Sequence, residues 1–308
     1  MGKHIPVLLK ETIDGLNVKP DGIYLDLTIG RAGHSSVILN KLTTGYLIGF
    51  DQDEEAIKES QATLSKISDR FTLIRSNFRN VSEKLRELSI THVDGILMDL
   101  GVSSPQFDEG ERGFSYRLDA PLDMRMDQSQ TLTAYQIINT FSLQDLERIM
   151  REYGEERFAL SIARNIIKQR EVSPIKTTFE LVEIIKKSKP AKELKKVGHP
   201  AKQVFQAIRI AVNDELNALQ VGLHEAIHLL RPHGGRLAII TFHSGEDRIV
   251  KAFFKELTTT VGNRIDGPVA EEEKDYRLIT TKPIVATDKE VSSNPRSQSA
   301  KLRIIERK

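Results

Sequence analysis

The chain has 308 residues, of which 39% are hydrophobic and 29% charged, and its formal net charge is +2. A chain of this length can bury a full α/β core and still carry a second domain. The absence of cysteine excludes disulfide scaffolds and thiolate metal sites. The sequence has no signal-type apolar start and no apolar run near the ~20 residues of a membrane span, so we expect a cytoplasmic protein without a membrane partner.

The first predicted unit is a strand, a glycine turn, a helix and a second strand. Residues 23–28 form a short apolar strand, residues 30–34 a turn, and residues 35–42 a helix. The second strand, 46–50, ends at Asp51, where nucleotide-type sites place an acid that accepts hydrogen bonds from ribose hydroxyls. A dinucleotide site needs another glycine where Thr28 stands. A ligand without phosphates, such as S-adenosylmethionine, does not need that close approach.

The fourth predicted strand delivers a second acid. It follows a third strand at 71–75, covers residues 95–99, and ends at Asp99. Because ligands of open α/β sheets bind at the carboxyl ends of the strands, we expect this carboxylate near the ligand crevice. The following turn, Ser103, Ser104 and Pro105, resembles the Ser/Asp-Pro-Pro-aromatic loop of amino-methyltransferases. Its hydroxyls and carbonyls can accept hydrogen bonds from an exocyclic amine as the nitrogen pyramidalises. A generic turn is the competing interpretation.

The pattern then changes from strands to helices. Residues 109–127 are irregular, and every segment from residue 133 to about 194 has helical periodicity. A helical block between two strands of a sheet indicates an inserted domain, which we assign to residues 110–210, between the two parts of the sheet domain at 1–109 and 211–308. The fifth strand is expected at 235–241. The final segments, 277–280 and 302–305, are expected to form a terminal antiparallel hairpin, giving a doubly wound, Rossmann-like α/β sheet.

The insertion carries candidate RNA contacts. Phe114 and Tyr116 alternate with arginines that include Arg125, a pattern that suits a flipped base and its flanking phosphates. A lysine run near the exit of the insertion faces only Glu193 among acids, and it is either a solvated surface or a phosphate-binding one. Its members are Lys186, Lys187, Lys189, Lys192, Lys195, Lys196 and Lys202. Arg209 lies in an apolar stripe, so its head is expected to reach a carboxylate or a phosphate.

The strand at 235–241 is followed by a short polar segment. Ser244 and Asp247 have the spacing of a capping box for the next helix. That leaves His243 without a structural role, and substrate contact and packing in the turn are equally compatible with it.

Nine ordered sequence blocks resemble the 16S ribosomal RNA cytosine-N4 methyltransferase family, the MraW type. They cover nearly the whole chain: HIPVLLKE at 4–11, GRAGHS at 30–35, DLGVSSPQ at 99–106, RGFS at 112–115, PLDMRMD at 121–127, GEERF at 154–158, FQAIRIAVN at 205–213, FHSGEDR at 242–248 and NPRS at 294–297. Three positions depart from the family pattern: Leu27, Ala32 and Gly245. Only Ala32 touches the expected cofactor turn, where a glycine is common.

The resemblance implies a class I methyltransferase that moves a methyl group from S-adenosylmethionine to N4 of one cytidine in the decoding region of small-subunit rRNA. It also implies site roles. Cofactor contacts would come from Ala32, Gly33 and His34 at the amino-acid end, Asp51 at the ribose, Phe78 at the adenine, and Asp99 and Gln106 at the methionine or base edge. Ser103, Ser104 and Pro105 would hold the cytosine amine. Phe114, Arg125 and His243 would contact the substrate.

Other functions remain open from the residues alone. The strand, glycine turn and acid also occur in nicotinamide-dependent oxidoreductases. A non-catalytic rRNA-binding assembly factor and a DNA amino-methyltransferase are further alternatives. The sequence does not separate free 16S rRNA from the assembled small ribosomal subunit as partner, and it is compatible with a homodimer.

Overall fold

The computed structural model describes residues 6–101, 110–259 and 274–308. Its contacts divide the chain into two compact units, one built from Met1–Gly101 with Asn217–Lys308 and the other from Val102–Leu216. No helix among the described residues is long and apolar enough to cross a membrane.

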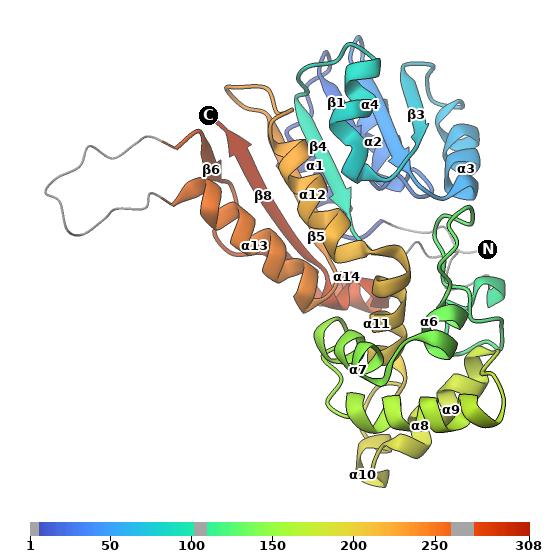
Figure 1. Cartoon of the computed structure of the whole chain (residues 1–308). Coiled ribbons are helices and arrows are strands. Elements are labelled where there is room, and N and C mark those ends of the chain that lie inside the picture. The colour runs from blue at the N-terminus through green and yellow to red at the C-terminus, as the bar shows by residue number, and fades with distance from the viewer. Residues whose placement is uncertain (1–5, 102–109, 260–273) are drawn as a thin grey trace, which may run out of the picture. The chain divides into compact units, whose positions relative to one another are not determined.

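The first unit is built on one mixed sheet. Among the described residues it has eight strands in the order β3-β2-β1-β4-β5-β8-β6, with β7 paired to β8 (Figure 1). The strands are β1 Ile23–Asp26, β2 Tyr46–Asp51, β3 Phe71–Arg75, β4 Gly95–Asp99, β5 Arg236–Thr241, β6 Tyr276–Leu278, β7 Ile284–Val285 and β8 Lys301–Arg307. Strands β1 to β5 are parallel, and β8 runs antiparallel to β5, β6 and β7. The predicted doubly wound sheet and terminal hairpin are therefore confirmed.

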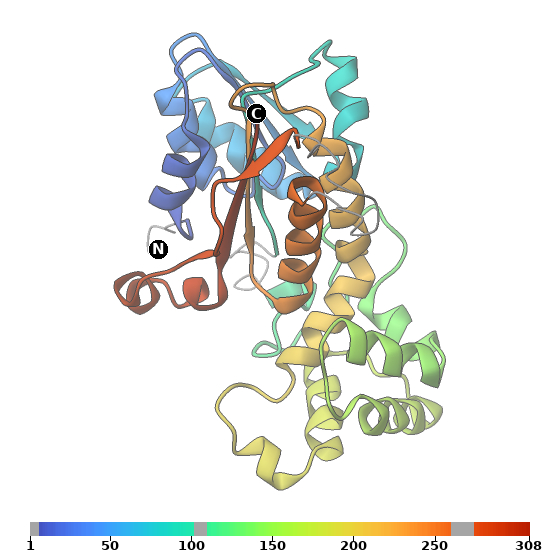
Figure 2. The same cartoon turned by 90° about the vertical axis from the view of Figure 1, so that its left-hand side faces the viewer.

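Helices cover both faces of this sheet, because its strands alternate apolar side chains between the faces. Tyr24 of β1 packs with one core and its neighbour Leu25 with the other. The first core takes residues from α1 Leu9–Leu16, α2 Gly33–Lys41 and α3 Glu54–Leu64, and the second from α4 Val81–Glu87, α12 Glu215–Ile227 and α13 Ser244–Thr258. Figure 2 shows this layered arrangement from the side. The short elements η1 Phe78–Asn80, α14 Asp288–Ser293 and η3 Pro295–Ser299 complete the unit.

The regular elements among the described residues of the second unit are helices, and residues 113–133 between them are irregular. The unit contains η2 Gly110–Arg112, α6 Ala134–Thr140, α7 Leu143–Glu152, α8 Ala159–Val172, α9 Thr178–Ser188, α10 Ala191–Leu194 and α11 Lys202–Asn213. Three of these helices begin at a side-chain N-cap. Thr133 with Gln136 and Thr177 with Glu180 form capping boxes for α6 and α9, and Ser142 caps α7. Their apolar faces meet in a separate core.

The order in which strands are added to the sheet reverses between β1 and β4. These neighbours are parallel, β2 and β3 continue on one side, and β5 lies on the other. Ligands of open α/β sheets bind beyond the carboxyl ends of the strands at such a switch point. Asp26 and Asp99 end β1 and β4, and Asp51 ends the adjacent β2.

Candidate functional site

The Asp51 carboxylate links the end of β2 to the glycine turn after β1. Its Oδ2 accepts a hydrogen bond from the Gly30 backbone N–H at 3.0 Å, and its Oδ1 accepts one from the Asp53 N–H at 2.9 Å. Burial raises the pKa of Asp51 to about 6, and the two backbone donors oppose that rise. Each oxygen keeps a lone pair, so the carboxylate can accept further hydrogen bonds from a bound ligand.

Asp26 is a second acid at this edge and is 2% exposed. Its Oδ2 accepts a hydrogen bond from the Ser35 hydroxyl at 2.7 Å, and its Oδ1 accepts one from the Thr28 N–H at 3.2 Å. Burial raises the pKa of Asp26 to about 6 despite these two donors. Its contacts hold the turn between β1 and α2 against the end of the strand.

Thr28 has a role that explains why no glycine stands there. Its hydroxyl oxygen accepts a hydrogen bond from the Asp99 backbone N–H at 2.6 Å. A glycine could not make this contact, which ties the turn after β1 to the last residue of β4.

Asp99 is the least satisfied of the three acids. Its Oδ2 lies 3.6 Å from His34 Nδ1, and its Oδ1 is buried with no hydrogen-bond partner among the described residues. Burial, and next the charges of Asp26 and Glu246, raise the pKa of Asp99 well above its ordinary value. A buried carboxylate oxygen without a donor is costly, so this atom fits a ligand that supplies one.

The turn from Gly30 to His34 has a tightly constrained backbone. Ala32 has φ 59° and is fully buried, so the chain takes a left-handed conformation in which a glycine has no steric cost. This conformation gives a physical reason for the glycine that is common here in the family. A Cβ at Gly33 would lie 2.5 Å from Cγ of Pro6, so the absence of a side chain lets the N-terminal segment pack on the start of α2.

Phe78, the residue expected at the adenine, begins η1 after β3. Its ring packs on Gly222 of α12, where a Cβ would lie 2.5 Å from the ring atom Cδ2. The sequence analysis missed Gly222. A glycine in the interior of a helix costs about 1 kcal/mol relative to alanine and needs a packing reason, and this was the available signal.

The end of β5 corrects the predicted cap. His243, and not Ser244, is the N-cap of α13, and it forms a capping box with Glu246. The His243 ring is 9% exposed, its Nδ1 accepts a hydrogen bond from the Glu246 N–H at 3.4 Å, and its Nε2 lies 3.1 Å from Glu246 Oε1. Asp247 instead pairs with Arg303 and Lys301 of β8. His243 therefore has the structural role that the sequence analysis did not find, and Glu246 is a buried acid that it missed.

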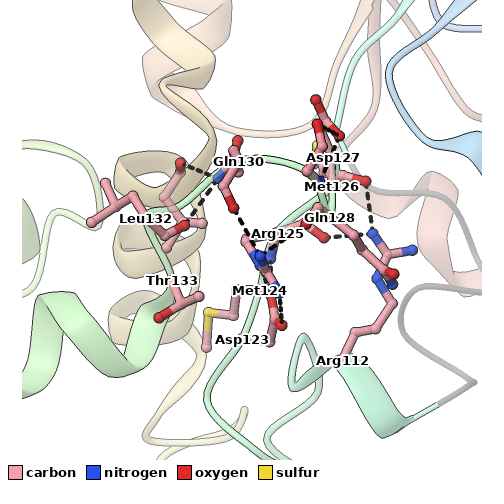
Figure 3. A network of polar contacts seen from close by, with 12 residues as sticks. Arg112, Asp123, Met124, Arg125, Met126, Asp127, Gln128, Gln130, Leu132 and Thr133 are labelled. Atoms are coloured by element: carbon pink, nitrogen blue, oxygen red, sulfur yellow. Dashed lines mark hydrogen bonds and ion pairs between the residues drawn. The ribbon is translucent and has the colours of Figure 1, made fainter.

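Two expected substrate residues also have structural roles. Phe114 is 3% exposed within the helical core, with the Arg112 guanidinium 5.5 Å from its ring centroid. Arg125 donates to both oxygens of Asp123 at 2.8 Å and to two backbone carbonyls, those of Gln128 and Gln130 (Figure 3). These contacts hold both side chains within the helical unit.

The lysine run divides into paired and unpaired members. Lys189 is buried and pairs with Glu156 at 2.6 Å, Lys186 pairs with Glu183, and Lys196 pairs with Glu193. The exposed members that form no ion pair within the described parts of the chain are Lys187, Lys192, Lys195 and Lys202. Arg209 reaches a carboxylate, as expected, with two hydrogen bonds of 2.7 and 2.8 Å to Glu215.

The remaining predicted residues, Ser103, Ser104, Pro105 and Gln106, lie outside the described residues. In the first unit the structure brings together Asp26, His34, Asp99 and Glu246 by direct contact or charge, and ties Asp51 to the same turn.

Comparisons with known proteins identify the family. The model described as the MraW methylase family matches residues 1–308. The chain belongs to this family. A relative from Exiguobacterium sibiricum, named ribosomal RNA small subunit methyltransferase H, is 55% identical over 309 residues, covering 100% of this chain and 99% of that protein.

Two solved structures have a more distant likeness. A putative rRNA-methylase from Clostridium thermocellum has a TM-score of 0.47 at 14% identity, covering 99% of this chain and 100% of that one. An rRNA methylase from Streptococcus thermophilus has a TM-score of 0.44 at 11% identity, covering 99% of each chain. Both likenesses are too distant to bear on function.

The family membership confirms the resemblance given by the nine sequence blocks. The chain is a methyltransferase whose methyl donor is S-adenosylmethionine, and not a nicotinamide-dependent oxidoreductase. The acids at the ends of β1, β2 and β4 fit this cofactor, since it carries ribose hydroxyls and an ammonium group that can donate hydrogen bonds to carboxylates. The unsatisfied Asp99 Oδ1 is the observation in this structure that most directly indicates a bound cation or N–H donor.

Proposed function

We propose that this methyltransferase modifies the exocyclic N4 of one cytidine in the decoding region of 16S rRNA. The observation that carries the proposal is the 55% identity, over the full chain, to a protein named ribosomal RNA small subunit methyltransferase H. The Ser103-Ser104-Pro105 segment directly after β4 supports an amine as the acceptor. Exocyclic base amines need hydrogen-bond acceptors as their nitrogen pyramidalises, and this segment supplies hydroxyls and carbonyls.

The proposed residue roles are those that the family resemblance implies, and the strand-end positions of Asp51 and Asp99 support them. Asp51 would accept hydrogen bonds from the ribose, Phe78 would pack on the adenine, and the turn from Ala32 to His34 would lie at the amino-acid end. Asp99 would accept a hydrogen bond from the ammonium group, and Gln106 would act beside it. S-adenosylmethionine supplies an activated methyl group on a sulfonium sulfur. The chain contributes orientation and acceptors, and without cysteine it has no thiolate route to a ring carbon.

The first test identifies the product. The purified protein is incubated with S-adenosylmethionine and either free 16S rRNA, assembled small subunits or duplex DNA, and the nucleosides are separated by mass spectrometry. We expect N4-methylcytidine in the RNA substrates. A methyl group at a ring carbon would defeat the amine assignment. Methylation of DNA alone would favour the DNA amino-methyltransferase alternative.

A variant of the proposed acceptor segment separates chemistry from cofactor binding. Ser104→Ala removes one hydroxyl, so single-turnover methylation should slow by about 10²-fold or less while the affinity for S-adenosylmethionine stays nearly unchanged. An equal rate in the variant and the wild type would remove Ser104 from the amine site.

A further inference from the structure

Two aromatic rings stack on each other in the helical unit. Tyr116 lies in the irregular segment after η2, and His199 lies between α10 and α11. Their ring centroids are 4.3 Å apart and their planes differ by 11°. The buried Phe205 of α11 meets the Tyr116 ring at 90°, with centroids 5.8 Å apart. Phe205 therefore fixes the Tyr116 ring from the core, while the two stacked rings are only half-buried.

A backbone hydrogen bond fixes the orientation of the His199 ring. Its Nδ1 accepts a hydrogen bond from the Ala201 N–H at 3.2 Å. Because a neutral imidazole has one donor and one acceptor nitrogen, Nε2 then carries the hydrogen. Burial, and next the nearby positive charges, lower the pKa of His199, which favours this neutral form. Nε2 has no hydrogen-bond partner among the described residues, so its N–H is available to a ligand.

The charges that act most strongly on His199 are positive. They come from Lys186, Arg117 and Lys189. The two lysines have acid partners, whereas Arg117 is exposed and forms no ion pair within the described parts of the chain. The guanidinium carbon of Arg117 lies 5.9 Å from the Tyr116 ring centroid. An unpaired cation beside partly exposed aromatic rings is complementary to a phosphate group next to a base.

We propose that the stacked rings of Tyr116 and His199 form a platform for one unpaired base of single-stranded RNA, with Arg117 bound to an adjacent phosphate. This inference rests on the proposed function, because it names where the RNA of that function contacts the helical unit. The base extends the stack beyond His199, as bases do on the aromatic side chains of single-strand-binding proteins. A base inside a duplex has both faces covered by its neighbours, so the platform selects an unpaired nucleotide.

The combination of rings and charge favours a nucleotide over an acidic peptide. A peptide carboxylate would bind the cation but would not use the preformed stack. A nucleotide uses both features, because its base supplies a further ring and its phosphate supplies the anion. Lys202, whose backbone N–H donates to the His199 carbonyl oxygen at 3.1 Å, adds an exposed cation close by in the chain.

The test compares two labelled probes of equal length, a single-stranded RNA and an oligomer with the same ribose-phosphate backbone but no bases. Fluorescence anisotropy gives the affinity of the full-length protein for each. His199→Asn removes the ring but keeps an oxygen that can accept the Ala201 N–H. It should weaken RNA binding by about 5- to 150-fold, the contribution of one stacked base, and leave the affinity for the abasic oligomer unchanged. Tyr116→Leu removes the supporting ring and should act in the same direction.

A third variant separates charge from stacking. Arg117→Gln should weaken the binding of both probes and lower the slope of log affinity against log salt by about 0.7, the contribution of one phosphate contact on a single strand. The two aromatic variants should leave that slope unchanged. Matched controls are Tyr135→Leu at an exposed tyrosine of α6 and Arg164→Gln at an exposed arginine of α8, and they should alter neither quantity.

The outcomes distinguish this inference from the proposed function. Equal RNA affinity in the wild type, His199→Asn and Tyr116→Leu would overturn the platform, while methylation of 16S rRNA by the wild type would leave the proposed function standing. Parallel losses for RNA and the abasic oligomer in the aromatic variants would also overturn it, because no base would then be stacked. A wild type that binds no RNA would count against both. If Tyr116→Leu does not fold, His199→Asn, which keeps the backbone contact, still decides.

Discussion

At the residue scale, three acids at the ends of neighbouring strands differ in what they contact. Both oxygens of Asp51 and of Asp26 accept hydrogen bonds from the chain, while Asp99 keeps one buried oxygen without a donor. This difference indicates different roles. Asp26 and Asp51 hold the turn after β1 through their hydrogen bonds, while the unpaired oxygen of Asp99 can accept a hydrogen bond from a ligand.

The first prediction concerns Asp51. Asp51→Ala removes the expected ribose acceptor, so the affinity for S-adenosylmethionine should fall by about 1.5–3 kcal/mol, the range for hydrogen bonds to a charged group. Asp51→Asn retains one acceptor oxygen and should show an intermediate loss. Isothermal titration calorimetry measures both. Unchanged affinity in Asp51→Ala would remove this residue from the site.

The second prediction concerns the stability contribution of Asp26. Its pKa is raised to about 6 in the folded protein from an ordinary value of 3.8, so folding favours its protonated form. The resulting stabilisation is complete below about pH 4 and is lost as pH rises through 6, a change on the order of 3 kcal/mol. The replaced side chain in the Asp26→Asn variant cannot ionise. The difference in unfolding free energy, variant minus wild type, should therefore increase between about pH 4 and 6 and stay constant above about pH 6.

Urea denaturation at a series of pH values checks this expectation. Asp14→Asn, at an exposed position of α1, is the control and should follow the wild-type curve. Curves of Asp26→Asn and wild type that remain parallel from pH 4 to 7 would mean that Asp26 ionises as easily in the fold as in the unfolded chain.

At the element scale, glycines in two helices allow close packing beside the proposed cofactor site. Gly33 at the start of α2 leaves room for Pro6, and Gly222 in α12 leaves room for the Phe78 ring. In both places a missing Cβ allows an element distant in sequence to approach closely.

The third prediction uses Gly222. In Gly222→Ala the new Cβ would lie 2.5 Å from the Phe78 ring, closer than carbon atoms can approach, so the ring must move. We expect a loss of about 1–3 kcal/mol of stability, typical of overpacking, and a weaker affinity for S-adenosylmethionine in the folded protein. Val221→Ala, on an exposed position of the same helix, is the matched control. Lower stability with an unaltered cofactor affinity would separate Phe78 from the adenine site.

At the scale of the whole molecule, charge is distributed unevenly between paired and unpaired groups. The net charge is only +2, and three of the seven lysines in the run, Lys186, Lys189 and Lys196, pair with neighbouring acids. The members of the run without an ion pair among the described residues are therefore the ones best placed to attract RNA.

The fourth prediction concerns those cations. Replacing Lys187, Lys192 and Lys195 by glutamine should weaken RNA binding and reduce the slope of log affinity against log salt by about 2, since each phosphate contact on a single strand contributes about 0.7. Cofactor affinity should not change. The control triple variant replaces Lys19, Lys41 and Lys66, which are exposed near the amino ends of the strands, away from the proposed site. An identical salt slope in the two triple variants would make the lysine run a solvated surface.

The sequence by itself determined the strands, their order of appearance and the acids that end them. Short apolar runs bounded by glycine turns specify buried parallel strands, and this local pattern located Asp51 and Asp99. The ordered sequence blocks determined the family and the cofactor. These features are written in consecutive residues, so no knowledge of distant contacts was needed.

Only the tertiary structure decided what the side chains contact. The sequence analysis assigned the cap of α13 to Ser244, and it linked Phe114 and Arg125 to the substrate. The structure gives the cap to His243, buries Phe114 in the helical core and binds Arg125 to Asp123. It also places His34 against Asp99, 65 positions further along the chain. Such contacts depend on which elements pack together, and packing between distant segments leaves no periodic signal in the sequence.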